Sequence, residues 1–401
     1  MSKKNRKWLV FTIMCLAYMQ GSYAQYQLSV YASELIQSFG LTTSQFSSLF
    51  TAPMIVAIFL SFVGGMISDK VGSKKVINIS FVIAGIGMIG RVFANSYMPF
   101  FLCMALTGFS NMFVNINASK ITASWFEQEK LGILMGIFAF CGQLPGAFAT
   151  ATTAVLFDSR TSAFIVSAIF CISVFVLWLL FVKDKPEDTM EEREKIDQEN
   201  QPSIGDSLKV VLSNKGVWLV SICIMMALGS TVTLSTFMPM ALQTMYGIDM
   251  KVCGTIASML TLGNCIGSIT GPIVFSKIKN VKVFVSGAAV LSFAGIIMCW
   301  RFPSIFVLHI LVLYTGIVLE ASMPIFLSAP VLLEGLGTKY AGSAAGVIST
   351  LQLLGAVLIP TYILTPIAGE NYSLLFMLAS ICMVIMFLCG LLLPQFGNNQ
   401  K

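Results

Sequence analysis

Long apolar stretches, separated by short turns, recur along this whole chain and constrain its fold more than any other feature. We predict helices near 8–31, 43–67, 75–95, 98–124, 131–156, 161–182, 216–243, 251–275, 282–300, 303–329, 340–366 and 371–394. Because about 20 apolar residues suffice for a helix to cross a bilayer, each stretch is long enough to span a membrane. Charged residues make up 10% of the chain, against about a quarter in soluble domains. The sequence therefore predicts an all-α integral membrane protein with about 12 transmembrane helices.

One long polar stretch, residues 183–215, interrupts this pattern near the middle of the chain. Its mixed charges are typical of a solvated linker, and Ser203–Leu212 is expected to form a short amphipathic helix at the membrane interface. We therefore predict an N-terminal six-helix bundle over 1–182, a cytoplasmic linker over 183–215 and a C-terminal six-helix bundle over 216–401.

The distribution of Lys and Arg predicts the orientation. With the N-terminus in the cytoplasm, only Arg91, Arg160, Lys251 and Arg301 fall on the outer side. The positive-inside rule therefore predicts a multi-pass protein of the plasma (inner) membrane with both termini cytoplasmic. The basic N-terminus followed by a long apolar stretch is interpreted as a retained anchor. The net charge of +6 favours contact with the lipid bilayer and gives no reason to expect nucleic acid.

Cysteine and histidine usage argues against most catalytic chemistry. The ten cysteines form no C-x-x-C pair, and His309 is the single histidine, expected at the interface. We therefore expect no metal site, no cofactor and no enzyme activity.

The two halves of the sequence resemble each other at an offset of 207 to 210 residues. Gly64 corresponds to Gly271, Lys75 to Lys282, and Arg91 to Arg301. The order of the matches is more informative than any one of them. Parallel repeats of this kind are the arrangement in which a transporter places its substrate between two halves that rock.

The segment from Gly65 to Lys75, GMISDKVGSKK, resembles the G-x-x-x-D-R-x-G-R-K signature of the major facilitator superfamily. Two positions depart from the signature. The family usually has Arg at the position of Lys70 and a basic residue at the position of Ser73. The resemblance covers the six-plus-six layout and implies the major facilitator fold, two pseudo-symmetric six-helix bundles. It assigns cytoplasmic gating to Gly65, Asp69, Gly72, Lys74 and Lys75. The alternative is that Asp69 and its lysines form a solvated turn.

Shorter stretches resemble particular transporters. Trp125-Phe126, Gly142-Gln143-Leu144 and Gln352-Leu353-Leu354-Gly355 are similar to stretches of the feline-leukaemia-virus-receptor family of choline and ethanolamine transporters. Trp-Phe with spaced glycines is also similar to nitrate, oxalate/formate and monocarboxylate porters. The choline-transporter resemblance implies Gln143 and Gln352 as ligand contacts.

Glu320 is the one acidic residue deep inside a predicted span. A charge at the bilayer centre costs about 2.5 to 3.5 kcal/mol on insertion scales. Glu320 is therefore predicted to bind a proton or a cationic ligand, or to tie two helices together. Lys120 lies near the end of the fourth span, where it either snorkels to the interface or attracts an anion. Arg91 and Arg301, at outer helix ends, are expected to be interface anchors.

Uncharged polar side chains complete the predicted lining of a substrate path, because amides in hydrocarbon need partners and a wet cavity supplies them. The candidates are Tyr23, Tyr26, Gln143, Gln352, Asn115 and Asn264. Tyr23 and Tyr26 share a helix face and offer an aromatic surface to an ammonium group.

We therefore expect a monomeric secondary transporter that moves a small organic solute by alternating access, by symport or antiport. The substrate is predicted to be a cation, a zwitterion or a weak acid carried with a proton. An exchanger of organic anions of the monocarboxylate type remains an alternative. A membrane receptor or scaffold without transport is the alternative from a different class.

Overall fold

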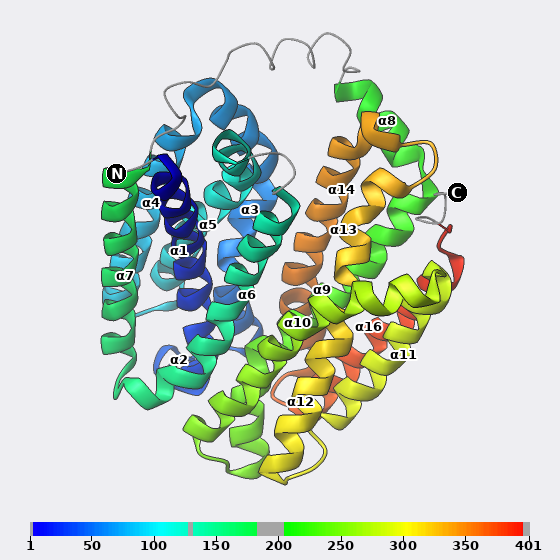
Figure 1. Ribbon diagram of the computed structural model, residues 1–401. Helices are drawn as coiled ribbons and strands as arrows, with labels where there is room; N and C mark the ends of the chain where they lie inside the picture. The colour runs from blue at the N-terminus through cyan, green and yellow to red at the C-terminus, as the bar shows by residue number, and fades with distance from the viewer. Residues whose placement is uncertain (1–2, 127–130, 183–203, 396–401) are drawn as a thin grey trace. The chain divides into compact units, whose positions relative to one another are not determined.

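A computed structural model describes residues 3–126, 131–182 and 204–395, and every regular element in these ranges is a helix (Figure 1). Residues 65 and 69 are described by their backbone alone. Ten stretches of the described residues are long and apolar enough to cross a membrane. The prediction of an all-α membrane protein is confirmed.

The chain forms two compact units. Unit 1 comprises Met1–Met190 with Asp249–Ser258, and unit 2 comprises Glu191–Ile248 with Met259–Lys401. The first half of the chain forms α1 (Lys3–Val30), α2 (Ala32–Phe39), α3 (Thr43–Val71), α4 (Ser73–Phe93), α5 (Tyr97–Trp125), α6 (Leu131–Leu156) and α7 (Arg160–Phe181). The second half begins with α8 (Ile204–Ser213), α9 (Lys215–Tyr246), α10 (Met250–Ile278) and α11 (Val281–Met298). It continues with α12 (Ile305–Glu320), α13 (Met323–Leu332), α14 (Gly337–Leu358), a π-helix (Ile359–Leu364), α15 (Thr365–Ala368) and α16 (Tyr372–Leu392).

The helix ends follow local chemistry. At the start of α3, Thr42 accepts a hydrogen bond from the Gln45 amide while the Gln45 side chain accepts one from the Thr42 amide, a capping box. The helices α9, α11 and α16 are each capped by the asparagine that precedes them, whose side-chain oxygen accepts from backbone amides of the first turn: Asn214, Asn280 and Asn371. These caps satisfy amides that would otherwise be unpaired where a span begins.

Two of the predicted spans are not continuous α-helices. The predicted span 303–329 is split into α12 and α13, and 340–366 passes through the π-helix. Pro360 has no N–H to donate within the helix, and the Thr365 amide donates to the Pro360 carbonyl, five residues back. Proline thus accounts for the local change of helix type.

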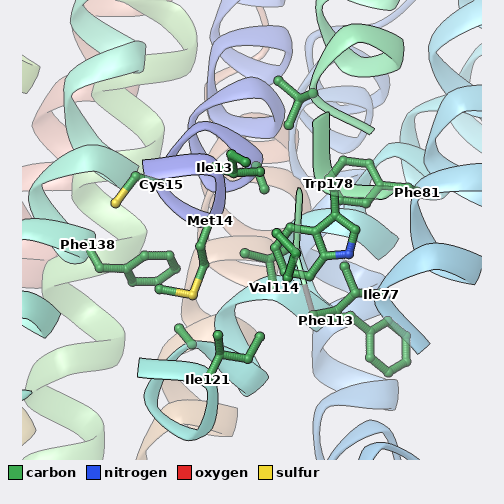
Figure 2. Close-up of a cluster of buried hydrophobic side chains, with 14 of the residues drawn as sticks. Ile13, Met14, Cys15, Ile77, Phe81, Phe113, Val114, Ile121, Phe138 and Trp178 are labelled. Carbon is green, nitrogen blue, oxygen red and sulfur yellow. The ribbon is translucent and has the colours of Figure 1, made fainter. Parts of the chain in front are cut away.

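Unit 1 has its core where α1, α4, α5 and α7 meet. Ile13 and Met14 of α1 lie beside Val114 of α5, with Phe81 of α4 and Trp178 of α7 completing the cluster (Figure 2). All five side chains are buried. Apolar packing on these helices fixes which of their faces turn inward, and so positions the polar side chains described next.

Candidate functional site

Glu320 is the last residue of α12, at the point where the tenth predicted span is interrupted. Ala321 and Ser322 separate it from α13, which has Pro324 in its first turn. Because Pro324 has no N–H, the Glu320 carbonyl lacks its usual donor four residues along. The Ser322 carbonyl instead accepts from the Ile325 and Phe326 amides, each at 3.2 Å. The carboxylate therefore lies at a helix end near mid-span, where backbone groups are available to a ligand.

The Glu320 side chain is partly exposed and has no counter-charge among the described side chains of its own unit. Among the described residues of unit 2, it forms neither an ion pair nor a hydrogen bond, and it lies within electrostatic range of the Cys265 thiol of α10. A carboxylate without a fixed basic partner can exchange a proton or pair with a mobile cation. The geometry thus leaves both predicted chemical roles of Glu320 available.

Close backbone contact between α10 and α12 fixes the position of Glu320. A Cβ added to Gly263, Gly267 or Gly271 would meet the backbone of Leu313, Ile317 or Ala321, respectively. The Asn264 side chain, 2% exposed, donates its amide to the carbonyls of Gly316 at 3.0 Å and Leu260 at 3.2 Å. Asn264 therefore ties the two helices together directly beside the glycine contacts.

Unit 1 carries a different polar group at the corresponding place. Ser110 of α5, the counterpart of Glu320 in the repeat, accepts a hydrogen bond from Nε2 of Gln20 at 2.9 Å. Oε1 of Gln20 and Oδ1 of neighbouring Asn111 are buried without a described donor. This part of α1 and α5 is neutral and leaves acceptor oxygens unfilled.

Tyr23 and Tyr26 lie on one face of α1, but the structure describes different surroundings for them. Tyr26 packs against Gly146 of α6 and meets Phe50 of α3 edge-on, with ring centroids 5.5 Å apart. Tyr23 is half-buried. Gln143 lies one turn before Gly146 and is also half-buried, so unit 1 brings Tyr26 and Gln143 to the same pair of helices. Asn115 is exposed on α5, and Gln352 is half-buried on α14 of unit 2.

The predicted gating residues surround the turn between α3 and α4. Gly72 has φ +96°, a conformation that favours glycine, and its N–H donates to the Ser68 carbonyl at 3.1 Å. Nδ2 of Asn117 donates to Oγ of Ser68 at 3.0 Å, which ties α5 to the end of α3. Lys75 is exposed in the first turn of α4, where Lys74 is half-buried. The side chain of Asp69 and the surroundings of Gly65 lie outside the described residues.

Lys120 lies on α5 three residues beyond Asn117 and is exposed. It therefore extends from the same end of α5 that ties to the α3–α4 turn through Asn117. Both roles predicted for it, snorkelling and attraction of an anion, require an exposed ammonium group.

Arg91 was expected at the membrane interface, but it is 1% exposed inside unit 1. Nη1 donates to the Ala24 carbonyl at 2.9 Å, Nη2 donates to Oε1 of Gln27 at 3.3 Å, and the guanidinium lies 4.5 Å from the centre of the Phe164 ring. Oγ of Ser167 donates to the same Gln27 oxygen at 2.6 Å. The sequence did contain a signal for this burial, because Arg91 continues the helical stripe of buried residues Ile77, Phe81, Ala84 and Met88.

Comparison with known proteins identifies the fold and the family. A solved structure of a bacterial homolog of the human lysosomal transporter Spinster, inward-facing and unoccupied, matches with a TM-score of 0.78 at 13% identity, covering 98% of this chain and 95% of that one. The probable sulfoacetate transporter SauU of Cupriavidus necator is 23% identical over 364 residues, 85% of this chain and 83% of SauU. A galacturonate transporter of Dickeya chrysanthemi is 22% identical over 309 residues, 74% of this chain and 90% of that protein.

The sequence profile described as Major Facilitator Superfamily matches residues 10–360, which is most of the chain. The match includes the turn with Gly72 and the helix break at Glu320, and it covers most of both units. The chain therefore belongs to the major facilitator superfamily, whose members it resembles in fold and in the secondary transport of small solutes.

Proposed function

We propose that this protein is a proton-coupled transporter of a small organic acid, with Glu320 as the group that binds the coupled proton. The observation that carries the proposal is the position of Glu320, a carboxylate at a helix break within a span, without a basic partner among the described residues of its unit. Relatives named as sulfoacetate and galacturonate transporters support an acidic substrate. Protonation of Glu320 before the transporter changes state would link movement of the solute to movement of a proton.

The remaining residues have supporting roles in this proposal. Uncharged polar side chains supply hydrogen bonds to the solute as its path opens and closes, namely Gln143, Gln352, Tyr23, Tyr26 and Asn115. Asn264 places α10 against α12, and Lys120 attracts the anionic solute toward unit 1. Because exposed charges act mainly through long-range attraction, Lys120→Gln should raise KM about threefold while leaving kcat unchanged.

The decisive experiment is uptake into proteoliposomes by wild type and Glu320→Gln. The amide keeps the size of the side chain but cannot titrate. We expect uptake driven by a pH gradient to disappear in the variant, while exchange of labelled solute at equal pH on both sides continues. Sulfoacetate and galacturonate are the first solutes to test. Glu334→Gln, at an exposed glutamate after α13, is the matched control and should transport normally.

A second candidate follows from the same carboxylate. If Glu320 instead holds a cationic or zwitterionic solute, Glu320→Gln weakens binding itself, by about 1.5–3 kcal/mol for a charge-assisted contact. Choline and ethanolamine are the test solutes, and binding is measured by the ligand's effect on thermal unfolding. Unchanged binding together with unchanged pH-driven uptake would refute both roles and leave Glu320 as a helix tie.

A further inference from the structure

An apolar groove of about 290 Å³ lies in unit 1 and is lined by residues of α3, α4 and α5. The lining residues are Leu60, Gly64, Ile67 and Val71 of α3, Val76, Ile79, Ser80 and Ile83 of α4, and Phe109 and Phe113 of α5. The one polar side chain in this set, Ser80, donates its hydroxyl to the Ile77 carbonyl at 2.7 Å, so it offers no free donor. The groove therefore suits a hydrocarbon chain.

Beside the groove, the Phe113 ring of α5 packs against Gly64 of α3. A Cβ on Gly64 would meet the Phe113 ring at 3.0 Å, whereas at Gly108 the same two helices meet backbone to backbone at Pro53. The helices thus touch at one point and are separated by side chains further along. The groove also borders α4, whose Ile79 is 58% exposed although it lines the groove.

Basic groups lie at the end of the groove where α3 passes into α4. Val71 and Val76 line the groove, and between them the chain carries Lys74 and the exposed Lys75. From position 69 to 75 the sequence has three lysines and one aspartate, a net positive charge. The first turn of α4 adds backbone amides without helical acceptors, which favour an anion.

We propose that this groove binds one acyl chain of an anionic phospholipid, with its phosphate at Lys75 and the first turn of α4. Apolar walls select the hydrocarbon chain, and the lysines select a negative headgroup over a zwitterionic one. The bound lipid would lie beside the turn with Gly72. This inference does not depend on the identity of the transported solute.

Photo-crosslinking of the full-length protein in liposomes tests the site. The probes are phosphatidylglycerol and phosphatidylcholine with a diazirine in the acyl chain, and labelled peptides are mapped by mass spectrometry. We expect phosphatidylglycerol to label the α3 and α4 peptides at least fivefold more than phosphatidylcholine. Equal labelling by the two lipids would overturn the assignment of an anionic headgroup.

Two pairs of variants separate the groove from general contact with lipid. Ile79→Trp fills the groove, whereas Ile86→Trp adds the same side chain two turns along the same face of α4, at a residue that is 59% exposed and not part of the groove. We expect a tenfold loss of labelling for Ile79→Trp and a change below twofold for Ile86→Trp. Equal labelling of these two variants would overturn the proposal.

The headgroup contact is tested by Lys75→Gln against Lys282→Gln, its exposed counterpart at the start of α11. One lysine near a membrane surface contributes about 1 kcal/mol toward an anionic lipid, so its loss should lower the preference for phosphatidylglycerol about fivefold. Lys282→Gln should leave the preference at the α3–α4 groove unchanged. An undiminished preference in Lys75→Gln would remove the phosphate contact from the proposal.

Discussion

The helix pair α3–α5 of unit 1 and the pair α10–α12 of unit 2 are counterparts in the repeat, yet they pack differently over much of their length. Each pair has a close contact in which a glycine of one helix meets the backbone of the other, Gly108 against Pro53 and Gly316 against Leu260. Beyond it, Gly263, Gly267 and Gly271 continue the backbone contact in unit 2, whereas Phe113 separates Gly64 from α5 in unit 1. The tightly packed pair carries Glu320 and the separated pair carries the groove.

The difference shows that corresponding helix pairs of the two halves can pack in two ways. Small residues along an interface let helix backbones approach closely, which immobilises the groups attached to them. Glu320 gains a fixed position in this way. Unit 1 instead holds a hydrogen-bonded serine at the corresponding place, and its looser interface leaves room for a ligand on the side facing α4.

The largest effect should come from a methyl group inserted at the tight contact. Gly271→Ala places a Cβ against the backbone of Ala321, which cannot move without shifting α12. We expect a loss of about 2–3 kcal/mol in unfolding free energy, measured by denaturation in mixed detergent micelles. Gly64→Ala meets the Phe113 ring, which can rotate, and should lose less than about 1 kcal/mol. Equal losses would mean that the two interfaces are equally tight.

The arginine pair should give the next largest difference. Arg91→Lys keeps the charge but loses the contact to Gln27 and the planar group against Phe164, so we expect a loss of about 1.5–2 kcal/mol. Arg301 is exposed beside the Trp300 ring, and Arg301→Lys should change stability by less than about 0.5 kcal/mol. Thermal unfolding in the same detergent compares them, and a stable Arg91→Lys would show that the guanidinium geometry is unimportant.

The turns after α3 and α10 differ in charge. Unit 1 has Asp69, and at an offset of 207 residues unit 2 has Ser276. If Asp69 stabilises one state of the transport cycle, Asp69→Asn should slow transport about tenfold, equivalent to ~1.4 kcal/mol, with substrate affinity and stability nearly unchanged. Ser276→Ala is the control and should transport at the wild-type rate. Wild-type rates for Asp69→Asn would remove the gating role.

The smallest effect is expected at the serine that corresponds to Glu320. Ser110→Ala removes the closer acceptor of Nε2 of Gln20, at 2.9 Å, and leaves the Ala17 carbonyl at 3.4 Å, so it should lower stability by about 1 kcal/mol. Ser124→Ala, in the same helix, removes only a bond to the Ile121 carbonyl and should change stability by less than about 0.5 kcal/mol. The difference between the two variants, measured in one denaturation series, isolates the contact between α1 and α5.

Hydrophobic length predicted the spans well because crossing a bilayer requires a minimum number of apolar residues. The expected helix 75–95 and the observed α4, Ser73–Phe93, differ by two residues at each end. The short helix expected at 203–212 is α8, Ile204–Ser213. By contrast, α2 was not predicted, because eight residues are too few to register as a span.

The arrangement of the site was less predictable, since it depends on which helix faces meet. Glu320 was identified because a charge inside a membrane span is costly, but the helix break beside it was not predicted although Pro324 is present in the sequence. Asn264 was expected to line the substrate path, and only the structure shows its amide bonded to two carbonyls between α10 and α12. Arg91 was predicted to lie at the membrane interface because it is near a helix end. Its burial instead follows from the stripe of buried residues on α4 that it shares with Phe81 and Met88.

The π-helix at Ile359–Leu364 has a consequence for how this chain tolerates changes in length. A π-turn holds one more residue than an α-turn, so this segment already accommodates a surplus residue within a span. Each residue added to an α-helix rotates everything after it by about 100°, which would turn a lipid-facing side chain toward its neighbours. Removal of one residue between 359 and 364 can instead be absorbed by conversion to an α-helix. Single-residue deletions should therefore be tolerated at this position far better than in the uninterrupted helices α4 or α16.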